Sequence, residues 1–150
     1  MTDTSEPLAQ PGAIHHVRLT VTDIARSKDF YARLLGTGPA ADFSDQAADP
    51  AVREDPARLF GGCVFSVGEQ LLGLRPVAEA GDRFRSTRVG LDHLSLAVAS
   101  PDELRAIASR LDAAGVPHGE VAELAGFGIA ILSVQDPDDI NLELTALLRS

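Results

Sequence analysis

Two short segments alternate between apolar and polar residues, and their sequences match each other. HVRLTV at residues 16–21 corresponds to HLSLAV at residues 93–98, an offset of 77 positions. Successive side chains of a strand point to opposite faces, so both segments are predicted to be half-buried strands. The more polar face carries His16, Arg18 and Thr20 in the first segment, and His93, Ser95 and Ala97 in the second.

Each predicted strand is followed by a segment with the spacing of an amphipathic helix. Asp23 is the candidate N-cap of the first helix. SPDE at residues 100–103 is a capping box with proline at the first helical position of the second helix, and Gly115 is expected to end it. The apolar stripes consist of Ile24, Phe30, Tyr31, Leu34 and Leu35 in the first helix, and of Leu104, Ile107 and Leu111 in the second.

Three further strands are predicted in each half, so the chain repeats one β-α-β-β-β unit. They lie near 40–43, at 63–67 and at 71–74, and again near 121, at 128–134 and at 141–147, with a turn at Asp138-Asp139. GGCVFSV from Gly61 matches GIAILSV from Gly128 at an offset of 67, which locates an insertion at residues 44–58 in the first half. We therefore predict an α+β protein with a tail at 1–12, modules at 13–79 and 91–148, and a linker at 80–90.

The composition excludes several classes of partner. The formal net charge of −9 disfavours nucleic acid and anionic membranes, because phosphate binding needs clustered Lys and Arg. No apolar run approaches the roughly 18 residues of a membrane helix. Cys63 is the single cysteine and lies in an apolar strand, so no intrachain disulfide is possible. A reducing compartment fits, and we expect a cytoplasmic protein with a small-molecule ligand.

One carboxylate interrupts the last predicted strand. Glu143 lies between two leucines, and a buried, unpaired carboxylate costs several kcal/mol, so it needs a partner. Aligning the last strands of the two modules sets LLGL at 71–74 against NLEL at 141–144, which makes Gly73 the counterpart of Glu143. The equivalent positions then hold His16, Gly73, His93 and Glu143.

Two imidazoles and one carboxylate are suitable ligands for a divalent transition metal with open coordination positions. The alternative is that both histidines are structural residues with satisfied hydrogen bonds. His15 and His118 are expected to be incidental, because His15 points away from His16 and His118 follows a loop proline.

Three motifs resemble the vicinal oxygen chelate superfamily: IHHVRLTVTDIARSKDFYARLLG, LDHLSLAV and DPDDINLEL. This superfamily includes glyoxalase I, bleomycin-resistance proteins, extradiol dioxygenases, methylmalonyl-CoA epimerases and fosfomycin-resistance thiol transferases. The resemblance covers about residues 13–146. It implies a cup-shaped, incompletely closed eight-stranded sheet with helices outside and one divalent metal ion (Fe, Mn, Ni, Co or Zn). The ligands carry over to His16, His93 and Glu143, and Glu143 is also the candidate catalytic residue.

Gly73 departs from the pattern of glyoxalase I, in which this position is a Glu that binds metal and shuttles the substrate proton. A ligand set of two His and one Glu is closer to extradiol dioxygenases and fosfomycin-resistance enzymes. Neither the His and Tyr that lie behind the metal ligands of the former nor the basic phosphonate-binding residues of the latter are apparent. Arg18, Thr20 and Ser95 are the candidate substrate-binding residues. Arg18 is either an exposed or salt-bridged arginine or an anchor for a substrate carboxylate or enolate.

Two functions stay open from the sequence. The first is a metalloenzyme of lyase, isomerase or dioxygenase type that chelates vicinal oxygens of a small substrate on the metal. The second is a non-catalytic protein that binds a small molecule or drug, as bleomycin-resistance proteins do. Tyr31 is expected to pack the outer face of the sheet rather than act as an acid or base. We also expect a homodimer, because each module leaves sheet edges that need a partner.

Overall fold

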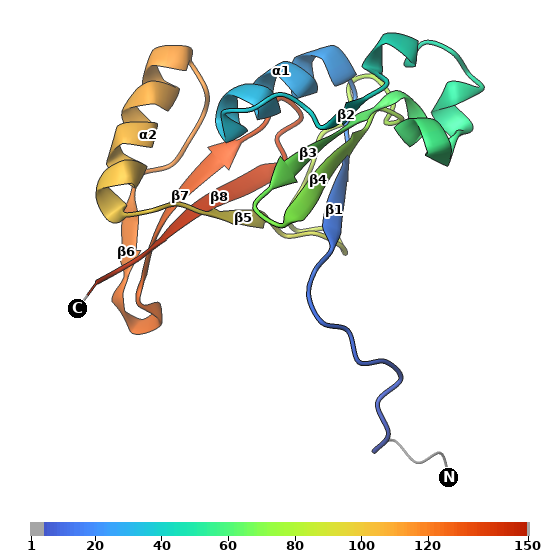
Figure 1. Ribbon diagram of the computed structural model, residues 1–150. Helices are drawn as coiled ribbons and strands as arrows, with labels where there is room; N and C mark the ends of the chain where they lie inside the picture. The colour runs from blue at the N-terminus through green and yellow to red at the C-terminus, as the bar shows by residue number, and fades with distance from the viewer. Residues whose placement is uncertain (1–4, 150) are drawn as a thin grey trace.

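Two mixed β-sheets of four strands, each with one α-helix, form the described part of the chain, residues 5–149 of a computed structural model (Figure 1). The strand order is β1-β4-β3-β2 in the first sheet and β5-β8-β7-β6 in the second. In both sheets the first strand pairs in parallel with the last, and the remaining pairs are antiparallel. The repeated α+β architecture predicted from the sequence is confirmed.

Each element follows in the predicted order. The first module contains β1 (His16–Thr20), α1 (Ile24–Leu35), β2 (Ala41–Asp42), β3 (Cys63–Val67) and β4 (Gln70–Arg75). The second contains β5 (Leu94–Ala97), α2 (Pro101–Ala114), β6 (Ala122–Leu124), β7 (Ile129–Gln135) and β8 (Asn141–Leu147). The insertion of the first module carries three short 3-10 helices, η1 (Ser44–Gln46), η2 (Val52–Glu54) and η3 (Pro56–Gly61), and η4 (Ala125–Phe127) precedes β7.

The helix ends are set by local hydrogen bonds. The Asp23 carboxylate accepts from the backbone N–H of Arg26 at 3.2 Å, as a helix N-cap does. Gly36 ends α1 and Gly115 ends α2, with φ of 70° and 69° in the left-handed region that glycine adopts without strain. At the repeat offset of 77 positions, Gly115 corresponds to Gly38 and not to Gly36. The two differ because α1 has 12 residues and α2 has 14.

The strand register confirms the alignment of the two modules. Arg18 of β1 lies beside Gly73 of β4, and Ser95 of β5 lies beside Glu143 of β8. Since Arg18 and Ser95 are related by the sequence repeat, Gly73 and Glu143 occupy equivalent positions of the two sheets.

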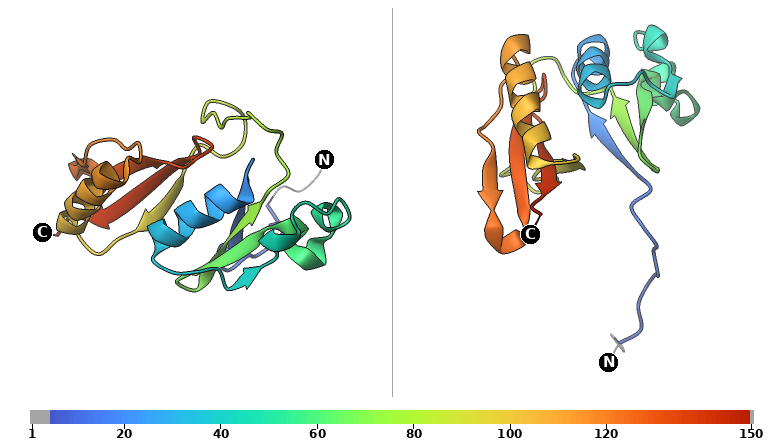
Figure 2. Two further views of the ribbon diagram at one scale, coloured as in Figure 1. Left: turned by 90° about the horizontal axis from the view of Figure 1, so that it is seen from above. Right: turned by 60° about the vertical axis from the view of Figure 1, so that its left-hand side comes forward.

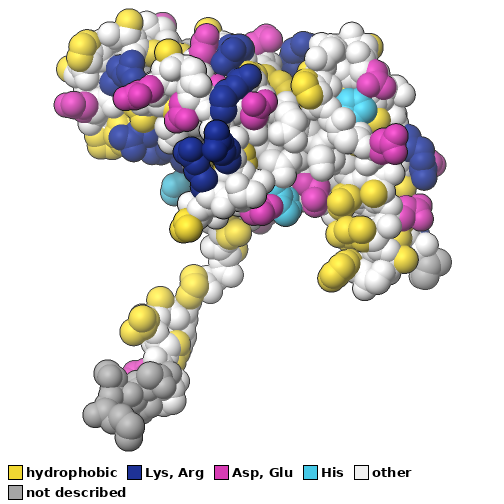
Figure 3. Space-filling model, turned by 180° about the vertical axis from the view of Figure 1, so that it is seen from behind, with side chains coloured by type: hydrophobic (Ala, Val, Ile, Leu, Met, Phe, Trp, Pro, Cys, Tyr) yellow, Lys and Arg dark blue, Asp and Glu magenta, His cyan; other side chains and the backbone are white. Residues whose placement is uncertain are grey.

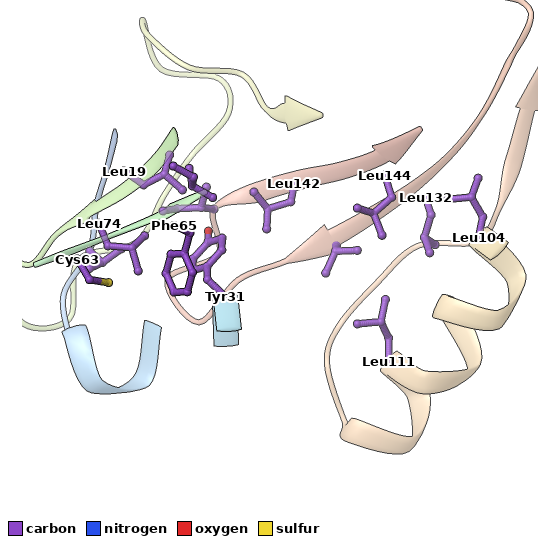
Figure 4. Packing of buried hydrophobic residues seen from close by; sticks show 14 of the residues in the cluster. Leu19, Tyr31, Cys63, Phe65, Leu74, Leu104, Leu111, Leu132, Leu142 and Leu144 are labelled. Atoms are coloured by element: carbon purple, nitrogen blue, oxygen red, sulfur yellow. The ribbon is translucent and has the colours of Figure 1, made fainter. Parts of the chain in front are cut away.

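The helices cover only one face of each sheet. Figure 1 shows α1 and α2 on the upper side of the molecule, with the strands below them. Tyr31, Phe65 and Leu74 of the first module and Leu132 and Leu142 of the second are fully buried on this side (Figure 4). Cys63 belongs to the same core, where burial raises the pKa of its thiol to about 12, so it is a small buried hydrophobic residue.

The two modules lie side by side (Figure 2). They are joined by the linker and by hydrogen bonds to side chains of the turn before β8. The turn before β8 contacts the start of the first module, where the Thr22 backbone N–H and hydroxyl both donate to the Asp138 carboxylate, at 2.9 and 2.5 Å. Tyr31 of α1 donates to Asp136 in the same turn. This turn therefore fixes the strand of Glu143 relative to the first module.

Two sequence expectations concern the ends and surface of the chain. The expected tail, residues 1–12, lies partly outside the described residues, which begin at residue 5, and the module boundaries stay predictions. Among residues 5–149, every helix is too short or too polar to cross a bilayer.

Candidate metal and substrate site

The candidate residues lie on the sheet faces that the helices leave uncovered. On β1, His16, Arg18 and Thr20 are exposed, whereas Leu19 between them is buried at 4 % exposure. On β5, Ser95 is exposed in the same way, and Glu143 of β8 is half-buried on the same face. The alternation predicted from the sequence therefore holds, and it brings the polar residues of each module to one surface.

His93 and Glu143 lie together on the second module. Their Nε2 and Oε2 atoms are 3.6 Å apart, and their side chains are 39 % and 19 % exposed. The Nδ1 atom of His93 lies 2.7 Å from Oδ1 of Asp92, and this hydrogen bond raises the pKa of His93, with a further contribution from the charge of Glu143. A carboxylate on Nδ1 orients the imidazole and directs Nε2 toward Glu143.

Glu143 has a second polar contact, which explains how the strand accommodates a carboxylate. The Thr145 hydroxyl donates to Glu143 Oε1 at 3.0 Å, and the hydroxyl groups of Thr145 and Ser95 are 2.5 Å apart. The carboxylate is thus neither fully buried nor unpaired. Ser95, predicted to bind substrate, lies within this hydroxyl network beside the carboxylate.

The His93–Glu143 pair fits a divalent metal ion. Two ligand atoms that are each about 2.1 Å from one ion lie roughly 3.0–3.5 Å apart at octahedral to tetrahedral angles. The observed separation of 3.6 Å between Nε2 and Oε2 is close to this range. A neutral imidazole and a carboxylate are also the donor types that such ions take.

His16 occupies the equivalent position on the first module but does not join this pair within one chain. Its Nδ1 atom lies 2.9 Å from Nδ1 of His15, and the two rings meet edge to face with centroids 5.1 Å apart. The contact engages both Nδ1 atoms. His15, expected to be incidental, therefore positions the ring of His16. Among residues 5–149, no three His, Cys, Asp or Glu side chains of the single chain converge on one point.

Arg18 and Thr20 line the first module beside Gly73. A Cβ atom added to Gly73 would lie 3.2 Å from Nε of Arg18, so the arginine side chain crosses the place where a fourth ligand would begin. The guanidinium of Arg18 lies over the ring of Phe60, 5.5 Å from its centroid. Thr20 is exposed beside Arg75 on the neighbouring strand.

Sequence reasoning missed Asp92, Arg75 and Phe60. An acidic residue directly before a candidate ligand is a signal that could have identified Asp92. Arg75 could have been found from the alternation of β4, which sets it on the same face as Gly73. Phe60 had no signal, because it reaches this face through the insertion, whose path the strand pattern does not predict. His118, the other histidine expected to be incidental, is bonded to Asp112 at 2.6 Å.

The chain matches a known family over most of its length. The family model of the Glyoxalase/Bleomycin resistance protein/Dioxygenase superfamily matches residues 13–144. No curated protein matches the chain.

Several solved structures share the fold of this chain. A glyoxylase/bleomycin resistance protein/dioxygenase domain from Frankia sp. EAN1pec is 29 % identical, with 92 % of this chain and 99 % of that chain covered and a TM-score of 0.70. A glyoxalase/dioxygenase from Nostoc punctiforme is 18 % identical, with 97 % and 100 % covered and a TM-score of 0.69. The fosfomycin resistance protein FosX from Listeria monocytogenes is 14 % identical, with 91 % and 94 % covered and a TM-score of 0.66.

Proposed function

Because this chain belongs to the Glyoxalase/Bleomycin resistance protein/Dioxygenase superfamily, we propose that it is a metal-dependent enzyme that acts on a small molecule with two neighbouring oxygen atoms. His16, His93 and Glu143 are the proposed metal ligands. The observation that carries the proposal is the 3.6 Å approach of His93 Nε2 to Glu143 Oε2, with Asp92 hydrogen-bonded behind the imidazole.

The residues around this pair have distinct tasks. Asp92 holds His93 with Nε2 facing Glu143, and Thr145 holds one oxygen of Glu143 by a hydrogen bond. A divalent ion held there would act as a Lewis acid toward the two substrate oxygens. Glu143 supplies the negative charge among the ligands. It is also the group that could accept a substrate proton, because its carboxylate lies on the uncovered face of the sheet.

We further propose that a second copy of the chain completes the site. Each module presents an uncovered polar face, and β1 and β5, which carry or adjoin the two histidines, are edge strands of their sheets. A two-fold axis that sets the first module of one copy against the second module of the other makes two equivalent contacts. His16 of each copy then approaches the His93–Glu143 pair of the other, and exposed sheet edges are covered.

A lyase, isomerase or dioxygenase reaction is compatible with these residues, and the expectation of a cytoplasmic protein stays a prediction from the sequence. The alternative is a cup that binds a small molecule without catalysis. The two functions differ in the role of Glu143, which is needed for metal binding in the enzyme and dispensable for ligand binding in the cup.

The test is metal analysis of protein purified without added metal, for the wild type and for Glu143→Gln and Glu143→Ala. The glutamine keeps the shape of the side chain and removes its charge. We expect near-stoichiometric metal in the wild type and loss of most of it in both variants. His118→Ala serves as the control, since His118 lies outside the site. Metal that is retained in Glu143→Ala, or a metal-free wild type that also fails to bind added Mn²⁺, Ni²⁺ or Zn²⁺, would refute the proposal.

A further inference from the structure

Two arginine side chains of the first module are stacked on one aromatic ring. The guanidinium carbon of Arg75 lies 3.7 Å from the centroid of Phe60, and that of Arg18 lies 5.5 Å from it. Arg75 comes from β4, Arg18 from β1, and Phe60 from η3, at the end of the insertion. A guanidinium over an aromatic ring is attracted to the ring face, and the stacking removes part of its hydration.

The insertion holds Phe60 in this position at a cost in backbone conformation. Leu59 and Phe60 have φ of 52° and 58°, a left-handed conformation that bulky residues rarely adopt. The Phe60 backbone N–H donates to the Asp55 carbonyl at 3.0 Å, which closes the turn. A Cβ atom at Gly62 would lie 1.7 Å from the carbonyl oxygen of Leu74, so only glycine permits this approach to β4. Strained conformations that the surroundings enforce cluster at binding and active sites.

Neither guanidinium has an anionic partner within the described residues. The side chains of Arg18 and Arg75 make no ion pair or hydrogen bond among residues 5–149, and Nε of Arg75 is inaccessible to solvent. The chain carries 22 acidic residues against 13 basic ones, so carboxylates that could neutralise these arginines are plentiful. The fold nevertheless keeps them away from both guanidinium groups.

Of the two arginines, Arg18 borders an open cavity. This cavity of about 340 Å³ is also lined by three arginines of the linker, Arg83, Arg85 and Arg88, and by two carboxylates, those of Asp82 and Asp138. Of the linker residues, Arg83 is engaged by the Asp139 carboxylate at 3.3 Å. Figure 3 shows Lys and Arg side chains gathered in a column across the middle of the face seen from behind. Arginines thus outnumber carboxylates around this cavity, in a protein whose formal net charge is −9.

We propose that Arg18 and Arg75, held by Phe60, form a subsite for an anionic group of the substrate, a carboxylate or a phosphate. Both anions accept the paired N–H donors of a guanidinium. The position of the subsite relative to the metal rests on the proposed function. Arg18 is two residues from His16 on the same face of β1, which corresponds to about 7 Å along a strand. The substrate class is therefore a small organic anion whose charged group lies several bonds from its two metal-directed oxygens.

The test measures anion binding directly, by NMR of the arginine side-chain Nε–Hε groups during titration with inorganic phosphate and, separately, with acetate. We expect saturable shifts of the Arg18 and Arg75 signals. The variants Arg18→Gln, Arg75→Gln and Arg75→Lys should each weaken anion binding by about tenfold. The glutamines remove the charge of the guanidinium. The lysine keeps the charge but lacks the planar pair of N–H donors. Phe60→Leu should weaken it as well, since the ring positions both groups.

Arg53→Gln is the matched control, because it removes one exposed arginine of the same insertion and should leave the affinity unchanged. Stronger binding of phosphate than of acetate assigns a phosphate-bearing substrate, and the reverse assigns a carboxylate. Repeating the titration in Glu143→Ala separates this inference from the metal site, since anion binding should persist there. Absence of saturable shifts in the wild type, or an equal loss of affinity in Arg53→Gln, would overturn the proposal.

Discussion

The Tyr31 hydroxyl donates a hydrogen bond of 2.7 Å to Oδ2 of Asp136 and so ties α1 of the first module to the turn that leads into β8. The other oxygen of Asp136 accepts from the backbone N–H groups of Asp138 and Ile140, both at 2.8 Å. The contact therefore orders the turn that precedes the strand of Glu143. It also gives the single tyrosine of the chain a structural role, as its place in the helix suggested.

Replacing Tyr31 by Phe is expected to lower the free energy of unfolding by about 1–3 kcal/mol, because a buried carboxylate loses a hydrogen-bond donor. Urea unfolding measures this decrease. The slope of the free energy of unfolding against urea concentration should be the same in the variant and the wild type. The control Thr37→Ala removes an exposed hydroxyl at a loop and should change stability by no more than about 0.5 kcal/mol. Unchanged stability together with lost activity would instead make Tyr31 a catalytic residue.

The pH dependence of stability is expected to change when Asp136 is replaced by Asn. Burial raises the pKa of Asp136 above its ordinary value of 3.8, despite the hydrogen bonds from Tyr31 and the backbone. Because the pKa of Asp136 is raised in the folded state, its protonated carboxyl group stabilises the fold. This stabilisation is complete below the pKa that Asp136 has in the unfolded chain. It is lost as pH rises through the pKa that Asp136 has in the folded protein.

Asp136→Asn removes this ionisation, so its stability relative to the wild type should increase as pH rises through the raised pKa of Asp136. Urea unfolding at several pH values checks the slope, and Asp45→Asn, at an exposed position, is the control. A difference between Asp136→Asn and the wild type that stays constant with pH would contradict the burial argument.

Asp92 is expected to set the metal affinity of His93 without touching the metal. Asp92→Asn should weaken metal binding by about 10- to 100-fold, because the imidazole loses the carboxylate that orients it and makes it more basic. Competition with a chelator measures the affinity. Glu79→Gln, an exposed change at the end of the first module, is the control. An unaltered affinity in Asp92→Asn would mean that His93 is not held as a ligand through Nδ1.

A carboxylate introduced by Gly73→Glu is expected to pair with Arg18 rather than to tighten metal binding. The added Cβ would lie 3.2 Å from Arg18 Nε, so the new side chain starts in contact with the arginine. In the double variant Gly73→Glu with Arg18→Ala, the carboxylate is freed and metal affinity should exceed that of the wild type. Gly73→Ala controls for the added methyl group. Tighter metal binding in Gly73→Glu alone would show that the Arg18 side chain moves away and does not pair with the new carboxylate.

The strand pattern predicted the parts of the site that depend on alternation and register. It set His16, Arg18 and Thr20 on one face of β1, and it identified Gly73 as the counterpart of Glu143, because neighbouring residues in a sheet are fixed by a period of two.

The remaining parts depend on contacts that no periodicity encodes. Phe60 reaches the sheet through two left-handed residues of the insertion, and Asp92 acts through one side-chain hydrogen bond. The separation of His16 from the His93–Glu143 pair follows from how the modules pack. This packing involves the turn at 136–140 and helix α1, which are far apart in the sequence.

The central proposal is that His16 of one copy completes the metal site of another, and a mixed dimer tests it most directly. Two differently tagged chains, one with His16→Ala and one with Glu143→Ala, are expressed together, and the dimer that carries both tags is purified. Each parent homodimer should lack metal. In the mixed dimer, one of the two sites combines the intact His16 of one chain with the intact His93 and Glu143 of the other, so metal content should recover to about half of the wild-type value. A mixed dimer as metal-free as its parents, or a chain that stays monomeric at micromolar concentration, would contradict a site shared between two copies.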